Sequence, residues 1–269
     1  MKNSIILFAL VTVFASCSKD KTTPATDPTE KGTVVLEFDN RAGSDDLILN
    51  NQQYRNAAGE SLTISQFNYF VSNFRFITAS GQVYTVPQDS CYFIIREDDK
   101  TTAFHTLYNV PAGDYTQVKF MIGVDSTRNT MDISKRQGTL DPAEGATGMY
   151  WSWNSGYIFV KLEGSSPAST DPQKLFRYHI GLYGGGFNNG PRTINNTREV
   201  TLTIPNNGKA IVRRDRRAQI HFFADALKLL NGTTNVSIAT NPDVMVSPFS
   251  EKIADNYTQM FNIDHVHNE

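Results

Sequence analysis

The feature that most constrains the fold of this chain is a two-residue hydrophobic alternation that recurs in many short runs. Apolar and polar side chains alternate at 34–38, 62–64, 70–76, 118–124 and 200–204. Turn-forming sequences such as Ser80-Gly81 and Pro205-Asn206-Asn207-Gly208 bound these runs. Because successive side chains of a strand point to opposite faces, each run predicts a strand with one buried face. The sequence therefore predicts an all-β, antiparallel sandwich of immunoglobulin-like or jelly-roll type.

One segment departs from this alternation and predicts a helix. Its apolar residues fit helical spacing, and Asn231-Gly232 would end the helix. These apolar residues are Ile220, Phe223, Ala224, Leu227 and Leu230. We expect a single short helix near 220–231, entered from a strand. The tail from Ile253 to Glu269 is polar and shows no regular pattern.

The N-terminus predicts export and lipidation. Lys2 precedes an apolar run at 5–14 that is too short for a transmembrane helix. Ala15-Ser16-Cys17 follows, and the whole resembles a bacterial lipoprotein signal over 1–17, in which Cys17 becomes the acylated first residue; an ordinary secretion signal is the alternative. Residues 18–32 are rich in Thr and Pro and predict a flexible tether, with the folded domain at 33–269.

This N-terminus also indicates a location. The chain is expected in the envelope of a Gram-negative bacterium, anchored to the outer membrane by its lipid. Ser18-Lys19-Asp20-Lys21 has some similarity to tethers that lead to the outer surface, so the periplasmic and surface faces both stay open.

Composition and motifs argue against several functions. The net charge is −2, and the basic run 213–217 is most simply a solvated face, so no nucleic-acid partner is expected. The chain has no Gly-x-Ser-x-Gly elbow, Walker loop, Rossmann fingerprint, His-Glu-x-x-His or Cys-x-x-Cys motif, and we expect no enzyme. With Cys17 acylated, Cys91 has no disulfide partner, and we expect it to be a small buried hydrophobic residue.

Histidines are the candidate metal ligands, because imidazole binds copper and zinc well. His265 and His267 form a His-x-His pair, which on an extended chain points both rings to one side. His179 lies off the apolar face of its run. His221 adjoins the helical segment and has a local structural role as its alternative. His105 gives no spacing signal.

Both tryptophans of the chain stand one residue apart, at Trp151 and Trp153. On a strand they would share a face with Tyr157. Two such rings are too bulky for most two-layer cores, so we expect one of them near the surface. Packing under a loop is the interpretation that the residues favour, ahead of stacking on a sugar or redox chemistry.

The same stretch carries a family resemblance. Asp141-Pro142, the run 148–157 (GMYWSWNSGY) and 161–164 (KLEG) resemble the signature of MbnP-like proteins, which are periplasmic or lipid-anchored copper proteins. Further similar pieces occur in order along nearly the whole of 33–269, at 69–74, 110–115, 120–125, 176–181, 260–261 and 264–267.

The resemblance implies a copper-binding β-sandwich. It implies that a tryptophan, Trp153 or Trp151, is oxidised to kynurenine at or near a copper held by histidine, by a dihaem partner similar to MauG and cytochrome c peroxidases. His179 is the best-matched ligand, and His265 and His267 are further ones. The methanobactin-associated member has extra cysteines after the histidine block, where this chain has Gly184-Gly185-Gly186.

Two other functions remain open at this point. A surface glycan-binding or adhesive module would use Trp151, Trp153 and Tyr157 as a stacking platform, with Asn154 and Glu163 as polar neighbours. A purely structural envelope domain would have scattered histidines.

Overall fold

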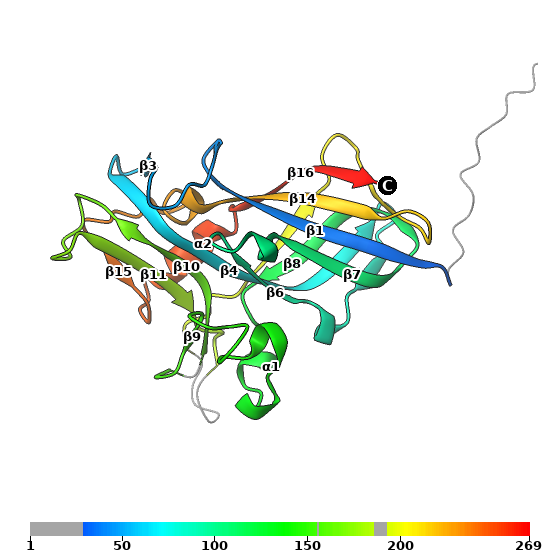
Figure 1. Ribbon diagram of the computed structural model, residues 1–269, viewed down its shortest axis with the longest axis horizontal. Helices are drawn as coiled ribbons and strands as arrows, with labels where there is room; N and C mark the ends of the chain where they lie inside the picture. Colours follow the sequence, from blue (N-terminus) through cyan, green and yellow to red (C-terminus); the bar gives the residue numbers. More distant parts are fainter. Residues whose placement is uncertain (1–28, 155, 186–192) are drawn as a thin grey trace, which may run out of the picture.

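A computed structural model describes residues 29–154, 156–185 and 193–269, and it shows two curled β-sheets packed face to face (Figure 1). The all-β sandwich is confirmed. The first sheet has the order β16-β14-β1-β2, and β7 pairs with β1 on the same edge as β2, opposite β14. Its strands are β1 (Lys31–Ala42), β2 (Asp45–Asp46), β7 (Phe104–Pro111), β14 (Ala218–Asp225) and β16 (Phe261–Asn268).

The second sheet is built around the long strand β4 (Ser61–Thr78). The order is β12-β8-β4-β10-β11-β15; β13 also pairs with β8, β9 with β10, and β3, β5 and β6 with β4. The remaining bounds are β3 (Gln53–Arg55), β5 (Val83–Thr85), β6 (Tyr92–Arg96), β8 (Gly113–Ile122), β9 (Tyr150–Trp151), β10 (Gly156–Ser165), β11 (Leu175–Gly181), β12 (Arg198–Thr203), β13 (Ala210–Val212) and β15 (Asp243–Val244).

Aromatic side chains from both sheets fill the space between them. Phe38 of β1 stacks on Phe222 of β14 with ring centroids 5.0 Å apart. Phe261 of β16 meets Phe120 of β8 edge to face at 5.1 Å, and Tyr69 of β4 at 5.4 Å. Because these residues point inward, the residues next to them on β14 and β16 point outward.

Helical structure is sparse in the described residues. The two α-helices are α1 (Ser126–Asn129) and α2 (Ser250–Tyr257), and single 3₁₀ turns lie at η1 (Gln88–Ser90), η2 (Lys100–Ala103), η3 (Ile133–Lys135), η4 (Gly138–Leu140) and η6 (Ala226–Leu229). Within the part of the chain that the structure covers, no helix has the length and apolarity to cross a bilayer.

The helix expected near 220–231 is entered from a strand, as predicted, but it is shorter than its helical spacing predicts: only the 3₁₀ turn η6 at Ala226–Leu229 is helical. Ile220, Phe222 and Ala224 are all buried, so period two continues through β14 to Asp225. The Asp225 side chain then accepts from the Leu227 N–H and caps the one turn η6. The tail from Ile253, whose sequence shows no regular pattern, lies in α2 and β16. Both elements bury apolar side chains, namely Ile253, Ala254 and Tyr257 of α2 and Phe261 and Ile263 of β16.

Candidate metal centre

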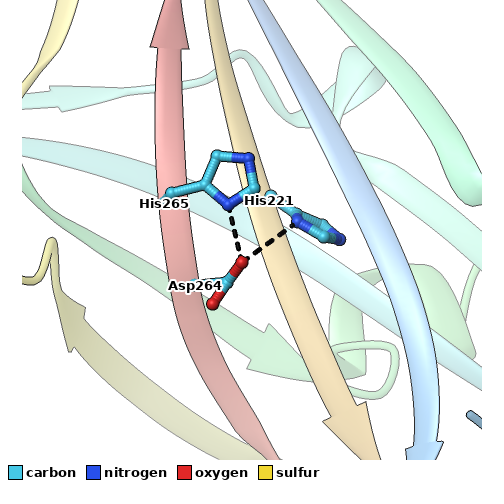
Figure 2. A group of neighbouring side chains, drawn as sticks. All are labelled: His221, Asp264 and His265. Carbon is cyan, nitrogen blue, oxygen red and sulfur yellow. Dashed lines mark hydrogen bonds and ion pairs between the residues drawn. The ribbon is translucent and has the colours of Figure 1, made fainter.

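A β-bulge in β16 builds a cluster of metal-ligand side chains. Phe222 of β14 pairs with Ile263, but the next residue, His221, pairs with His265, so Asp264 is an extra residue in β16. A bulge lets two consecutive residues oppose one residue of the partner strand. Asp264 and His265 consequently both lie beside His221 on the outer face of the sheet (Figure 2).

The distances within this cluster are those of converging donors. The Oδ2 atom of Asp264 lies 2.6 Å from Nδ1 of His265 and 3.6 Å from Nδ1 of His221. One donor atom from each of the three side chains lies within 4.8 Å of the other two. His267 follows on the same face, with its Nε2 atom 2.8 Å from Nε2 of His265.

Strand β1 adds charged neighbours to the cluster. Asp39 lies with its Oδ2 atom 3.8 Å from Nε2 of His221 and 3.6 Å from Nε of Arg41. The Arg41 guanidinium lies 3.2 Å above the ring of Phe223, the next outward residue of β14. A carboxylate beside a ligand imidazole orients the ring and raises its basicity, so Asp39 can position His221.

The donor set fits a copper or zinc ion. His221 is the least exposed of the three donors, with 15% of its side chain accessible against 42% for Asp264 and His265. Its Nδ1 atom is buried and has no hydrogen-bond partner within the described residues. Buried polar nitrogens normally have a hydrogen-bond partner. An unpartnered nitrogen that faces a carboxylate and a second imidazole can instead bind a metal cation together with them.

The structure therefore brings together three of the four histidines that the sequence put forward. His265 and His267 lie as the His-x-His pattern predicts. His221 joins them because β14 and β16 are neighbours, whereas the spacing of the apolar residues around it predicts a helix. Sequence reasoning missed Asp264, since a regular strand would point it away from His265, and no sequence signal marks the bulge.

His179 lies elsewhere, on β11 of the second sheet. Its Nε2 atom is 2.6 Å from Oε1 of Glu163, and this hydrogen bond is the main reason why the pKa of Glu163 falls below its usual value. Lys161 of β10 is also 3.3 Å from the same oxygen. A lone imidazole between a carboxylate and an ammonium is a weak metal site, because the cation already neutralises the carboxylate.

The face that carries His179 continues to the tryptophans. A Cβ atom on Gly181, two residues further along β11, would come within 2.7 Å of the Trp151 ring, so this ring covers Gly181 closely. Residues two apart on a strand are about 7 Å apart on one face. Trp151 thus covers a residue two positions from His179, and both lie on a different sheet from the His221 cluster.

The two tryptophans have different environments, which corrects the shared-face prediction. Trp151 ends the two-residue strand β9 and is 4% exposed, whereas Trp153 lies in the following turn and is 66% exposed. Their ring centroids are 5.6 Å apart. Tyr157 is fully buried, and its hydroxyl donates to the Leu140 carbonyl. Trp151, Trp153 and Tyr157 therefore form no exposed stacking platform.

His105 is half-buried and packs against an aromatic ring. Its ring stacks on Phe93 with centroids 4.2 Å apart, and burial lowers the pKa of His105 to about 4. A neutral, stacked imidazole of this kind has a packing role.

The fold and the cluster define a class: a β-sandwich with imidazole and carboxylate donors on one outer face. The family model named MbnP matches residues 31–246, and the chain belongs to the MbnP family. Among solved structures, MbnP from Methylosinus trichosporium has 16% identity and a TM-score of 0.51, over 77% of this chain and 80% of that one. A search of curated proteins found no match. The matched residues include His179, Trp151 and Trp153, but end before Asp264, His265 and His267.

Proposed function

We propose that this protein binds copper in the cell envelope, at the cluster on the outer face of β14 and β16. The observation that carries the proposal is the convergence of His221, Asp264 and His265, whose donor atoms lie within 4.8 Å of one another. Membership of the MbnP family supports it, since the resemblance of the sequence to MbnP-like proteins implies a copper protein.

The residues of the cluster have separate roles. His221, Asp264 and His265 are the ligands. His267 meets the opposite nitrogen of the His265 ring, and it orients that ring. Imidazole and carboxylate donors without sulfur favour Cu(II) over Cu(I), which prefers thiolate and thioether. Bound copper would supply a redox-active cation; the protein would act as a carrier or store and not as an enzyme.

Copper titration of the purified chain against a competing chelator, followed by electron paramagnetic resonance, tests this proposal. We expect one Cu(II) per chain and a loss of affinity of more than 100-fold in His221→Ala and in His265→Ala. Positioning residues outside the ligand set typically contribute about 10- to 100-fold, which is our expectation for His267→Ala. His179→Ala is the matched control and should retain full affinity. If only His179→Ala lost copper binding, the copper site would instead lie on the face that carries Trp151.

The tryptophan modification is the second part of the proposal. Trp153 is the residue that a dihaem MauG-like partner could oxidise to kynurenine, because it is exposed whereas Trp151 is buried. Peptide mass spectrometry of protein from its native envelope should show loss of one carbon and gain of one oxygen on Trp153. An unmodified Trp153 in protein that carries copper would refute the tryptophan oxidation but not the copper site.

We also propose that an acyl group on Cys17 anchors the chain to the outer membrane. Cys17 and residues 18–28 lie outside the described residues, so the support is the signal-like sequence alone. Metabolic labelling with a fatty acid should mark the wild-type protein and leave Cys17→Ala unmarked.

A further inference from the structure

One end of the sandwich gathers exposed basic and aromatic side chains around the start of β1. Lys31, the first residue of β1, pairs with Pro111 at the end of β7. Val34 pairs with Ala218, so the loop that precedes β14 lies at the same end, and Asn268 of β16 pairs with Ala218 there too. Figure 1 shows the start of β1 and the end of β16 together at this end of the molecule.

The loop 213–217 between β13 and β14 is held in place and leaves two cations free. Arg213 bonds Asp114 at 2.7 Å, and Arg217 bonds Glu269 at 3.1 Å. The side chains of Arg214 and Arg216 are exposed and have no hydrogen bond or ion pair to any described residue. The backbone N–H of Arg214 donates to the Glu30 side chain at 2.5 Å, which ties the loop to the chain just before β1.

The same end carries an exposed tyrosine beside Lys31. Tyr108 of β7 is 71% exposed and Val83 of β5 is 56% exposed. Between these two strands lies a cleft of about 540 Å³, lined among others by Lys31, Tyr84 and Tyr108. Lys31 is exposed and has no side-chain partner in the described residues. Aromatic rings with a polar tip, next to free cations, have the chemistry of a membrane–water interface.

We propose that this end of the domain docks on an anionic phospholipid surface. Arg214, Arg216 and Lys31 contact lipid phosphates, and Tyr108 and Val83 lie at the headgroup level. Asp215 opposes this attraction and limits it to a modest strength. Docking supplements the acyl anchor and positions the domain on the bilayer.

The length of chain before β1 favours this surface. The docking geometry rests on the Cys17 anchor of the proposed function, and the copper site plays no part in it. The thirteen residues between Cys17 and Lys31 span at most roughly 50 Å when fully extended. An anchor there keeps the start of β1 within reach of the bilayer, and the free cations lie at this end.

Co-sedimentation with vesicles tests the surface without the anchor. A chain beginning at Ser18 keeps every described strand and helix and has no acylated cysteine. We expect it to bind vesicles that contain phosphatidylglycerol, to ignore vesicles of pure phosphatidylcholine, and to lose binding as salt rises. Each basic residue near an anionic surface contributes about fivefold, so Arg214→Gln/Arg216→Gln should lower the partition coefficient roughly 25-fold.

Two controls make the result decisive. Lys135→Gln/Lys252→Gln removes the same charge from exposed positions on η3 and α2, and should change the partition coefficient by less than about threefold. Tyr108→Ser should weaken binding at unchanged net charge. Equal losses in both double variants, or equal binding to both kinds of vesicle, would overturn the proposed surface. Fatty-acid labelling of Cys17 is a separate readout, so failure of the anchor and failure of the surface are distinguishable.

Discussion

Replacing each tryptophan by alanine should separate a core ring from an accessible one. A tryptophan side chain can bury about 250 Å², and each Å² of apolar surface contributes about 25 cal/mol. Trp151 is 4% exposed and Trp153 is 66% exposed. These exposures give upper estimates of about 6 kcal/mol for Trp151 and about 2 kcal/mol for Trp153. Measured costs of Trp→Ala in cores are about 3–5 kcal/mol, so we expect that range for Trp151→Ala and about 1 kcal/mol for Trp153→Ala.

Urea unfolding followed by far-UV circular dichroism measures both changes without relying on tryptophan fluorescence. Thermal unfolding should agree, because 1 kcal/mol shifts Tm by about 2–4 °C in a domain of this size. Trp151→Phe is the matched control and should recover part of the loss. Equal destabilisation by Trp151→Ala and Trp153→Ala would refute the assigned burial. It would also remove the argument that Trp153 is the ring an external oxidant can reach.

Three further predictions concern a half-buried histidine, a loop contact and a close approach of two strands. Burial lowers the pKa of His105 to about 4, so between pH 4 and about 6.5 the unfolded chain binds a proton that the native chain does not. The free energy of unfolding should therefore be highest above about pH 6.5. It should fall by up to roughly 3 kcal/mol as the pH drops toward 4. Urea midpoints at pH 7 and pH 4.5 should show this loss, and His105→Gln should reduce it. Glu60 accepts hydrogen bonds from the N–H groups of Ile238 and Ala239, so Glu60→Ala should cost about 2–3 kcal/mol by equilibrium unfolding. The exposed control Glu144→Ala should cost less than about 1 kcal/mol. Gly164→Ala should lower Tm strongly because the new Cβ atom would lie 2.0 Å from the Thr63 carbonyl oxygen; an unchanged Tm would contradict this close approach of β10 and β4.

The strand content of this protein could be predicted from local sequence. Alternation at Val34, Leu36 and Phe38, for example, needs only a strand with one buried face, and β1 buries all three. The helix near 220–231 shows the limit of this reasoning. Ile220 and Ala224 fit both a period of two and a helical period, and the deciding residue is Phe222, which packs on Phe38 of a strand that is distant in sequence.

The sequence by itself determined the residue types of the candidate site: a His-x-His pair near the end of the chain, a third histidine at position 221, and two tryptophans one residue apart. Only the tertiary structure decided their grouping. Pairing of β14 with β16 brings His221 to His265, and the bulge at Asp264 turns a carboxylate onto the imidazole face. The turn after β9 exposes Trp153 while Trp151 packs over Gly181. Strand propensity acts between neighbouring residues, whereas strand partners and bulges depend on packing between segments far apart in sequence, so the residues could be predicted but not their convergence.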